Sequence, residues 1–213
     1  MNLELVPYKK YESELPQNGQ HILGQLRGNN IIVYQAFNPE ISEFAVRNQK
    51  FGGSSYSFSR MSWIKPNFLW MMYRAGWASK PNQECILAIE IGLDKLELIL
   101  EKAVYSSFQP DVYTDKSNWE NDINSSEVRL QWDPDHDPKG NKLNRRAMQL
   151  GMKGKILKQF ATEWIVSIED ISSFVKKQGE LVVNYDLENL VVVKEQVISI
   201  QNNETIKKIK IDI

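Results

Sequence analysis

The segment that most constrains the fold is the run at residues 85–91, which reads CILAIEI and is apolar at every position but one. A strand exposed on one face alternates apolar and polar residues, whereas a strand covered on both faces is apolar almost throughout. The run therefore predicts a central strand with packing elements on both sides. With 213 residues, of which 42% are hydrophobic, the chain is long enough for one such core, and two full domains are not expected.

Further strands are predicted from β-branched and aromatic runs and from apolar alternation. With the central run, the predicted core strands lie near 31–35, 85–91, 128–132 and 164–168. Helical spacing of apolar residues appears between them, so we expect an α+β fold with a mixed sheet flanked by helices.

Proline, glycine and asparagine residues, which favour turns and loops, mark the boundaries between the expected segments of the chain. Residues 1–30 are expected to form an N-terminal arm, 31–180 the α+β core domain, and 181–213 C-terminal strands that pack on the same domain. The last of these include a β-hairpin formed by 197–200 and 206–213. The polar stretch 109–126 is predicted to be a flexible loop.

Two segments carry helix boundary signals. Asn38 and Pro39 suit the cap and first position of a helix that Gly52 and Gly53 would end. Pro66 opens a second helix, whose residues 68–73 are all large and apolar and which Gly76 would terminate. Such a helix is expected to be buried on most sides.

Charge and cysteine content exclude several classes of protein. The formal net charge is −1, so a nucleic-acid surface would need local clustering of basic residues. The single Cys85 excludes an internal disulfide and a multi-cysteine zinc site, and a cytoplasmic protein without a membrane segment or a resident metal is expected. The turn at residues 133–137, with three carboxylates and His136, is interpreted either as a divalent-cation site or as a solvated acidic turn.

Aromatic and basic side chains are concentrated in residues 60–74. Rings that stack on a planar base and cations that bind phosphates would form one wall of a nucleotide pocket. The alternative is a core helix whose flanking Arg60 and Arg74 pair with surface acids.

A second basic segment spans residues 139–158, with seven basic residues and no acidic one. Its Arg145, Arg146 and Lys153 are candidate contacts to a phosphate chain, together with Trp132 from the preceding strand. The other interpretation is a solvated charged face.

Four strings resemble the bacterial and fungal family known as domain of unknown function 4291. They are 32–37 (IVYQAF), 60–77 (RMSWIKPNFLWMMYRAGW), 131–134 (QWDP) and 163–166 (EWIV), and the likeness spans residues 27 to about 175. This resemblance implies no settled activity.

Residues 33–41 and 46–51 are also similar to the opening of ADP-ribosyltransferases, in which a strand that holds the nicotinamide ribose of NAD runs into a helix. This resemblance implies an ADP-ribosyltransferase-like fold with NAD as substrate. It places Gln35 at the position of the family's ribose-binding residue, although Gln35 is neither histidine nor arginine, and no motif assigns the catalytic glutamate. Glu163 is the candidate catalytic carboxylate. The residues expected to bind the cofactor are Arg27, Tyr34, Arg60, Lys65, Tyr73 and Arg74.

Three functions therefore remain open. The first is an ADP-ribosyltransferase-like enzyme that binds NAD in a cleft and modifies a nucleotide or a nucleic acid. The second is a nucleic-acid-binding or RNA-processing module that uses residues 139–158, and the third is a protein-interaction domain with its tryptophans in the core. A nucleotide ligand is the expected partner, RNA or DNA is a further candidate, and the oligomeric state is left open.

Overall fold

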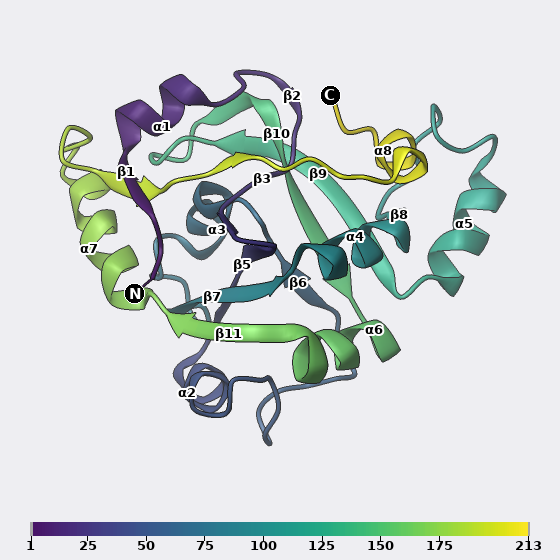
Figure 1. Ribbon diagram of the computed structural model, residues 1–213, viewed down its shortest axis with the longest axis horizontal. Coiled ribbons are helices and arrows are strands. Elements are labelled where there is room, and N and C mark those ends of the chain that lie inside the picture. The colour runs from purple at the N-terminus through teal and green to yellow at the C-terminus, as the bar shows by residue number, and fades with distance from the viewer. Residues whose placement is uncertain (1, 213) are drawn as a thin grey trace.

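The apolar run predicted to be central forms strand β7 (Cys85–Gly92), which lies inside a four-stranded sheet. The computed structural model, which describes residues 2–212, orders this sheet β11–β7–β5–β4, with every neighbouring pair antiparallel. The partner strands are β4 (Leu26–Arg27), β5 (Asn30–Phe37) and β11 (Ile165–Asp170). Figure 1 shows β7 and β11 crossing the middle of the molecule.

A second sheet is built on two long antiparallel strands, β9 (Val128–His136) and β10 (Lys142–Met152). Strand β8 (Ala103–Tyr105) adds to β9 in parallel, while β2 (Gly19–Gln20, parallel) and β6 (Ser62–Ile64, antiparallel) pair with the other edge of β10. The α+β class is confirmed. All four predicted core strands form and are divided between the sheets, because 128–132 lies in the second sheet and the other three lie in the first.

The helices surround these sheets. They are α1 (Tyr8–Glu14), α2 (Pro39–Asn48), α3 (Phe68–Ala75), α4 (Leu93–Glu101), α5 (Lys116–Ser125), α6 (Gly154–Gln159), α7 (Ser172–Val183) and α8 (Asn203–Ile209), with a π-helical turn at Phe160–Trp164.

Asparagine caps fix the starts of α2 and α3. The Asn38 side chain accepts from the Ile41 amide at 3.0 Å, and the Asn67 side chain accepts from the Trp70 amide at 2.6 Å. Helix α3 therefore begins after Asn67 and not at Pro66, and it ends as predicted at Gly76, whose φ of +58° is in the left-handed region.

The first sheet is covered on both faces. Ile31 and Val33 of β5 pack into a core that includes β9, β10 and α4, whereas Ile32 and Tyr34 face a second core with α3, α7 and α1. Successive strand residues point to opposite faces, so one continuous apolar run serves both cores.

A double hydrogen bond joins the two sheets. The Tyr34 amide donates to the Lys65 carbonyl at 2.7 Å, and the Lys65 amide donates back to the Tyr34 carbonyl at 3.1 Å. This bridge holds the segment that follows β6 against the carboxyl-terminal half of β5. Segments 31–37 and 60–74, far apart in the sequence, therefore lie next to each other.

The predicted hairpin at 197–200 and 206–213 is wrong. Residues 203–209 form α8, because the Asn202 side chain caps the amides of Glu204 and Thr205 at 3.0 and 3.1 Å. The two ends of the chain pair with each other instead: β1 (Leu5–Pro7) with β12 (Val191–Val193), and β3 (Leu23–Gly24) with β13 (Gln196–Val197).

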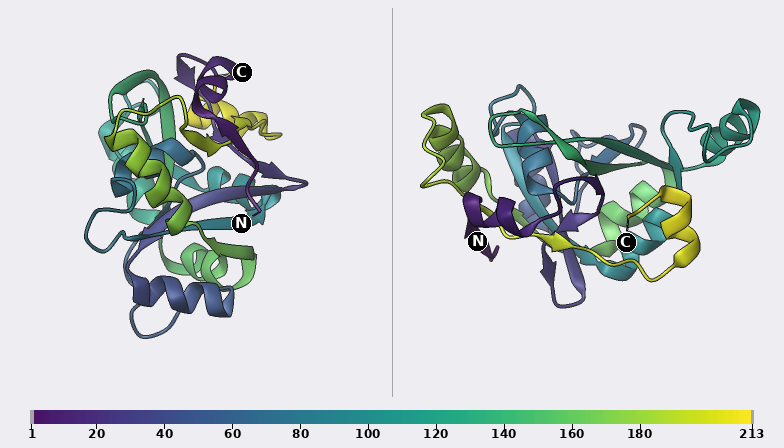
Figure 2. Two further views of the ribbon diagram at one scale, coloured as in Figure 1. Left: turned by 90° about the vertical axis from the view of Figure 1, so that its left-hand side faces the viewer. Right: turned by 90° about the horizontal axis from the view of Figure 1, so that it is seen from above.

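The stretch 109–126, predicted to be a loop, contains α5. No residue of α5 is buried, so the sequence lacks the apolar stripe from which a helix is predicted. The helix is capped by the Asp115 side chain, which accepts a hydrogen bond from the Asn118 backbone amide at 2.8 Å. In Figure 1 and in the right-hand view of Figure 2, α5 stands at one end of the molecule and α7 at the other. Within residues 2–212, no helix is long and apolar enough to cross a membrane.

Candidate functional site

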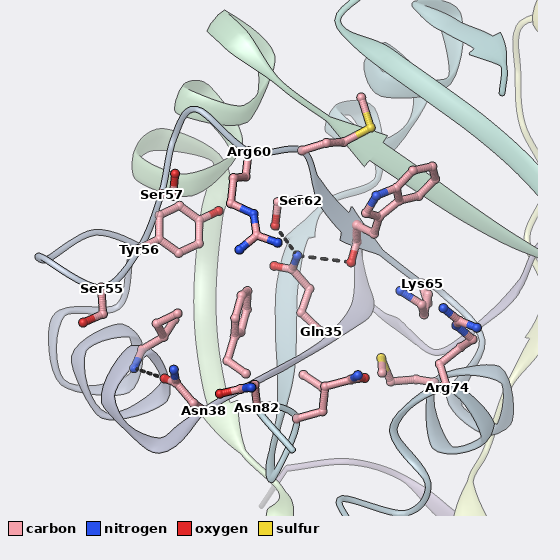
Figure 3. Close-up of a pocket in the computed structure, with 17 residues that line it drawn as sticks. Gln35, Asn38, Ser55, Tyr56, Ser57, Arg60, Ser62, Lys65, Arg74 and Asn82 are labelled. Carbon is pink, nitrogen blue, oxygen red and sulfur yellow. Dashed lines mark hydrogen bonds between the residues drawn. The ribbon is translucent and has the colours of Figure 1, made fainter. Parts of the chain in front are cut away.

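A cavity of about 790 Å³ opens where the two sheets meet (Figure 3). Ligand sites in proteins commonly fall between about 300 and 1,000 Å³. The cavity is bounded by the end of β5, the start of α2, the loop before β6 and the last turn of α3. Its lining residues are Gln35, Ala36, Phe37, Asn38, Ile41, Ser55, Tyr56, Ser57, Arg60, Met61, Ser62, Trp63, Lys65, Met71, Arg74, Asn82 and Gln83.

The charges that line this cavity are all positive. Arg60, Lys65 and Arg74 contribute three cations, and no Asp or Glu is among the lining residues. Within the described chain, none of the three lies in an ion pair with a carboxylate. Guanidinium and ammonium groups without counter-charges favour an anion, and phosphate is the anion that their donor geometry fits best.

Lys65 is the most buried of these cations, with 7% of its surface exposed. Burial, reinforced by the charge of Arg74, lowers the pKa of the Lys65 amine to about 7, and Asp133 opposes the shift. The Lys65 amine therefore titrates near neutral pH. An anion bound beside Lys65 would favour the protonated form.

Gln35 presents an unused acceptor at the cavity. Its side chain is almost fully buried, and its amide nitrogen donates to the Ser62 hydroxyl at 2.7 Å and to the Trp63 carbonyl at 3.2 Å. The Oε1 atom has no hydrogen-bond partner within the described residues. Because buried polar atoms are nearly always paired in folded proteins, this oxygen indicates a place where a ligand donates a hydrogen bond.

A second cavity, of about 310 Å³, adjoins the first. The two cavities share Trp63, Lys65 and Arg74 as walls. The remaining walls of the smaller cavity are Trp70, Gln131, Asp133 and Gln149. Together they form one groove with a cationic centre, hereafter the groove.

Asp133 is the one carboxylate among the described residues that line the groove. One oxygen accepts a hydrogen bond from the side-chain Nε2 of Gln131 and the other from the side-chain Nε2 of Gln149, both at 2.8 Å. These two bonds fix the orientation of the carboxylate. Since each carboxylate oxygen has two lone pairs, both oxygens keep an accepting position free.

Of the site residues predicted from the sequence, the structure brings together four in the groove: Gln35, Arg60, Lys65 and Arg74. Tyr34, the neighbour of Gln35, points to the opposite face of β5. Its ring packs edge-on against the Phe68 ring, with 5.6 Å between the ring centroids. The alternation of strand residues makes it impossible for both Tyr34 and Gln35 to face one cavity.

Arg27 and Tyr73 also lie outside the groove lining. Arg27 binds Glu90 at 2.6 Å and Glu169 at 3.3 Å. The Tyr73 ring stacks on the His136 imidazole with 3.6 Å between ring centroids. Arg27 is thus engaged in ion pairs and Tyr73 in ring stacking.

Glu163 is not brought to the groove. It lies exposed in the π-helical turn at Phe160–Trp164, which precedes β11, a strand that begins at Ile165. The structure therefore separates this carboxylate from Gln35.

The basic segment 139–158 does not form a single face, because it turns from β10 into α6. Arg145 is 1% exposed and binds Asp135 at 2.7 Å, with two further bonds to Glu12 at 3.0 and 3.1 Å. This buried ion network is a correction to the surface position expected for Arg145. Arg146, its neighbour on the other face, is exposed.

Trp132 and Lys153 also lie outside the groove lining. Trp132 is 8% exposed, lies in the core and donates its indole N–H to the Ile209 carbonyl at 3.0 Å. Lys153 is the residue that precedes α6. The carboxylates of the turn at 133–137 are engaged separately, Asp135 with Arg145 and Asp137 with the amides of Lys139 and Asn141.

Sequence inspection missed Gln131, Asp133 and Gln149 as groove residues. A signal was present, because the i, i+2 spacing of Gln131 and Asp133 places them on one face of a strand. Gln149 is directly opposite Gln131 in the β9–β10 register. Recognising the set required the pairing of β10 with β9, and no strand had been predicted there.

Comparison with known proteins identifies a family. Residues 21–198 match the sequence profile of a family described as a domain of unknown function (DUF4291). No curated protein matches the chain.

Proposed function

The chain belongs to the DUF4291 family, whose description assigns no activity, and we propose from its groove that it binds NAD and transfers the ADP-ribosyl group to an acceptor. The observation that carries this proposal is the set of three cations, none of them paired with a carboxylate, beside the unused acceptor oxygen of Gln35. An ADP-ribosyltransferase-like fold belongs to the same proposal. Its support is that β5 runs directly into α2 at the edge of the cavity.

The pyrophosphate is assigned to the cationic centre. Each of Arg60 and Arg74 offers a planar guanidinium that can donate two hydrogen bonds to phosphate oxygens, and Lys65 adds a compact positive charge. Gln35 Oε1 is assigned to a hydroxyl of the nicotinamide ribose. Phe37 and Tyr56 supply aromatic surface for a planar ring.

The transfer step needs an acceptor with a removable proton. The bond from ribose C1′ to the nicotinamide nitrogen breaks, and its electron pair leaves with neutral nicotinamide. A new bond forms between C1′ and the acceptor atom, whose proton passes to a carboxylate. Asp133 takes this role in the proposal, because it lies on the groove and Glu163 does not.

Calorimetric titration of the full chain with NAD and with ADP-ribose tests the binding. We expect R74M and R60M each to weaken both ligands about tenfold or more, since a hydrogen bond to a charged group contributes about 1.5–3 kcal/mol. The matched control is K176M, which removes an exposed lysine of α7 outside the groove. Absence of heat for both ligands contradicts the proposal.

Release of nicotinamide tests the carboxylate. We expect D133N to lower the rate at unchanged NAD affinity and E163Q to leave the rate as in the wild type. The opposite pattern would return the role to Glu163.

A further inference from the structure

The smaller cavity of the groove has a different chemistry from the larger one. Its lining combines the hydrogen-bond-accepting carboxylate of Asp133, the two cations Lys65 and Arg74, and the indole rings of Trp63 and Trp70. Asp133 keeps two free accepting positions, while Lys65 and Arg74 form no ion pair with a carboxylate among the described residues. A complementary ligand therefore carries adjacent donors for Asp133 and acceptors for Lys65 and Arg74.

Aromatic surface lines the same cavity. Trp63 is half-buried, and its indole lies across Gly151, where an added Cβ would come within 2.8 Å of two indole carbons. Trp70 is 3% exposed, and its indole N–H has no acceptor among the described residues. A planar ring of a ligand can stack on the Trp63 indole.

We propose that the smaller cavity binds a guanine base, free or within a nucleic acid. Guanine is the common base with two adjacent donors, N1–H and the 2-amino group, which match the two oxygens of Asp133. Its O6 and N7 atoms are acceptors and are the usual partners of arginine and lysine, here Arg74 and Lys65.

Other planar ligands fit the wall less well. Adenine and cytosine place a ring-nitrogen lone pair beside their amino group, and that lone pair would face an oxygen of Asp133. A guanidinium or ammonium group on a protein acceptor would be repelled by Lys65 and Arg74. The combination of Asp133 with two cations thus selects guanine.

The role of this base as the acceptor of the ADP-ribosyl group rests on the proposed function. Its binding does not, because the base can be titrated without NAD. The position is suitable, since the two cavities share Trp63, Lys65 and Arg74 and a base in one lies beside a nucleotide in the other.

The test is titration of the full wild-type chain with guanosine, inosine and adenosine 5′-monophosphates at one salt concentration. Inosine monophosphate lacks only the 2-amino group. We expect guanosine monophosphate to bind about tenfold more tightly than inosine monophosphate and adenosine monophosphate to bind more weakly still. Equal affinity of the guanine and inosine nucleotides overturns the proposal.

Two variants locate the preference. D133N is expected to remove the preference for guanine over inosine. R60M is expected to weaken both nucleotides equally, because Arg60 lines only the larger cavity, where it would contact the phosphate and not the base. A guanine preference that survives in folded D133N also overturns the proposal.

Single-stranded oligonucleotides with one guanine or one adenine, as RNA and as DNA, identify the source of the base. Preference for guanine in either form supports the site, and absence of preference in both forms and in the free nucleotides refutes it. A separate NAD titration distinguishes the two proposals: guanine selectivity without NAD binding defeats only the proposed function, whereas NAD binding without guanine selectivity defeats only this inference.

Discussion

Binding of ADP-ribose should depend on pH through Lys65. The free amine has a pKa of about 7, which burial and Arg74 lower from the ordinary 10.5. A bound pyrophosphate favours the charged amine, so the pKa rises in the complex. A group whose pKa is raised on binding strengthens binding at low pH, and that contribution is lost as the pH rises above the pKa of the free state.

The size of the effect follows from the two pKa values. When the bound state restores the pKa of Lys65 fully to 10.5, affinity falls about fifty-fold between pH 7 and pH 9. The pyrophosphate of ADP-ribose keeps its charge over this range, so the change reports the protein. Fluorescence or calorimetric titration from pH 6 to pH 9 at constant ionic strength measures it.

Charged groups around Lys65 define the controls. Arg74 and Asp133 face it, and the pKa of Glu195, raised by burial to about 8, falls in the same range although Glu195 does not line the groove. K65M removes the amine with little change of shape and should bind weakly with a flat profile. R74M should move the midpoint to higher pH. A K65M variant with the wild-type slope, or a flat wild-type profile, refutes the reasoning.

Three further predictions concern the groove wall and the core. G151A is expected to displace the Trp63 indole together with Met61, because the added Cβ would lie 2.8 Å from two indole carbons and 2.6 Å from Met61 Sδ. It should weaken binding of guanosine monophosphate in a protein that still unfolds cooperatively, and unchanged affinity would contradict this wall. Because the pKa of Glu195 is raised to about 8 by burial, the folded state holds the proton more tightly than the unfolded state, so stability should fall as pH rises from about 4.5 to 8; urea titrations should show this fall in the wild type and not in E195Q. R145M leaves Asp135 buried without its partner and should lower the free energy of unfolding by about 3–5 kcal/mol, and a loss below 1 kcal/mol would show that the ion network is dispensable.

Local patterns in the sequence were sufficient for much of the fold. The apolar run at 85–91 predicted a strand with two covered faces, and Gly76 predicted the end of α3. Patterns failed where the deciding interaction was distant or polar. The isoleucines near the C-terminus permitted a strand or a helix, and the cap at Asn202 decides for α8.

The site shows the same division. Arg60, Lys65 and Arg74 are close in sequence, so their common location was predictable from one segment. Asp133 was not, because it reaches the groove through pairing of β9 with β10 and through contacts with Gln149. Predictions for single residues also failed where strand alternation or burial decides the direction of a side chain, as for Tyr34 and Arg145.

A crystal of the full chain grown with saturating NAD tests the central claim most directly. The account predicts that the pyrophosphate lies within hydrogen-bond distance of the Arg60 and Arg74 guanidinium groups and the Lys65 amine, with a ribose hydroxyl donating to Gln35 Oε1. NAD bound elsewhere on the protein, or an unoccupied groove at saturation, would contradict it.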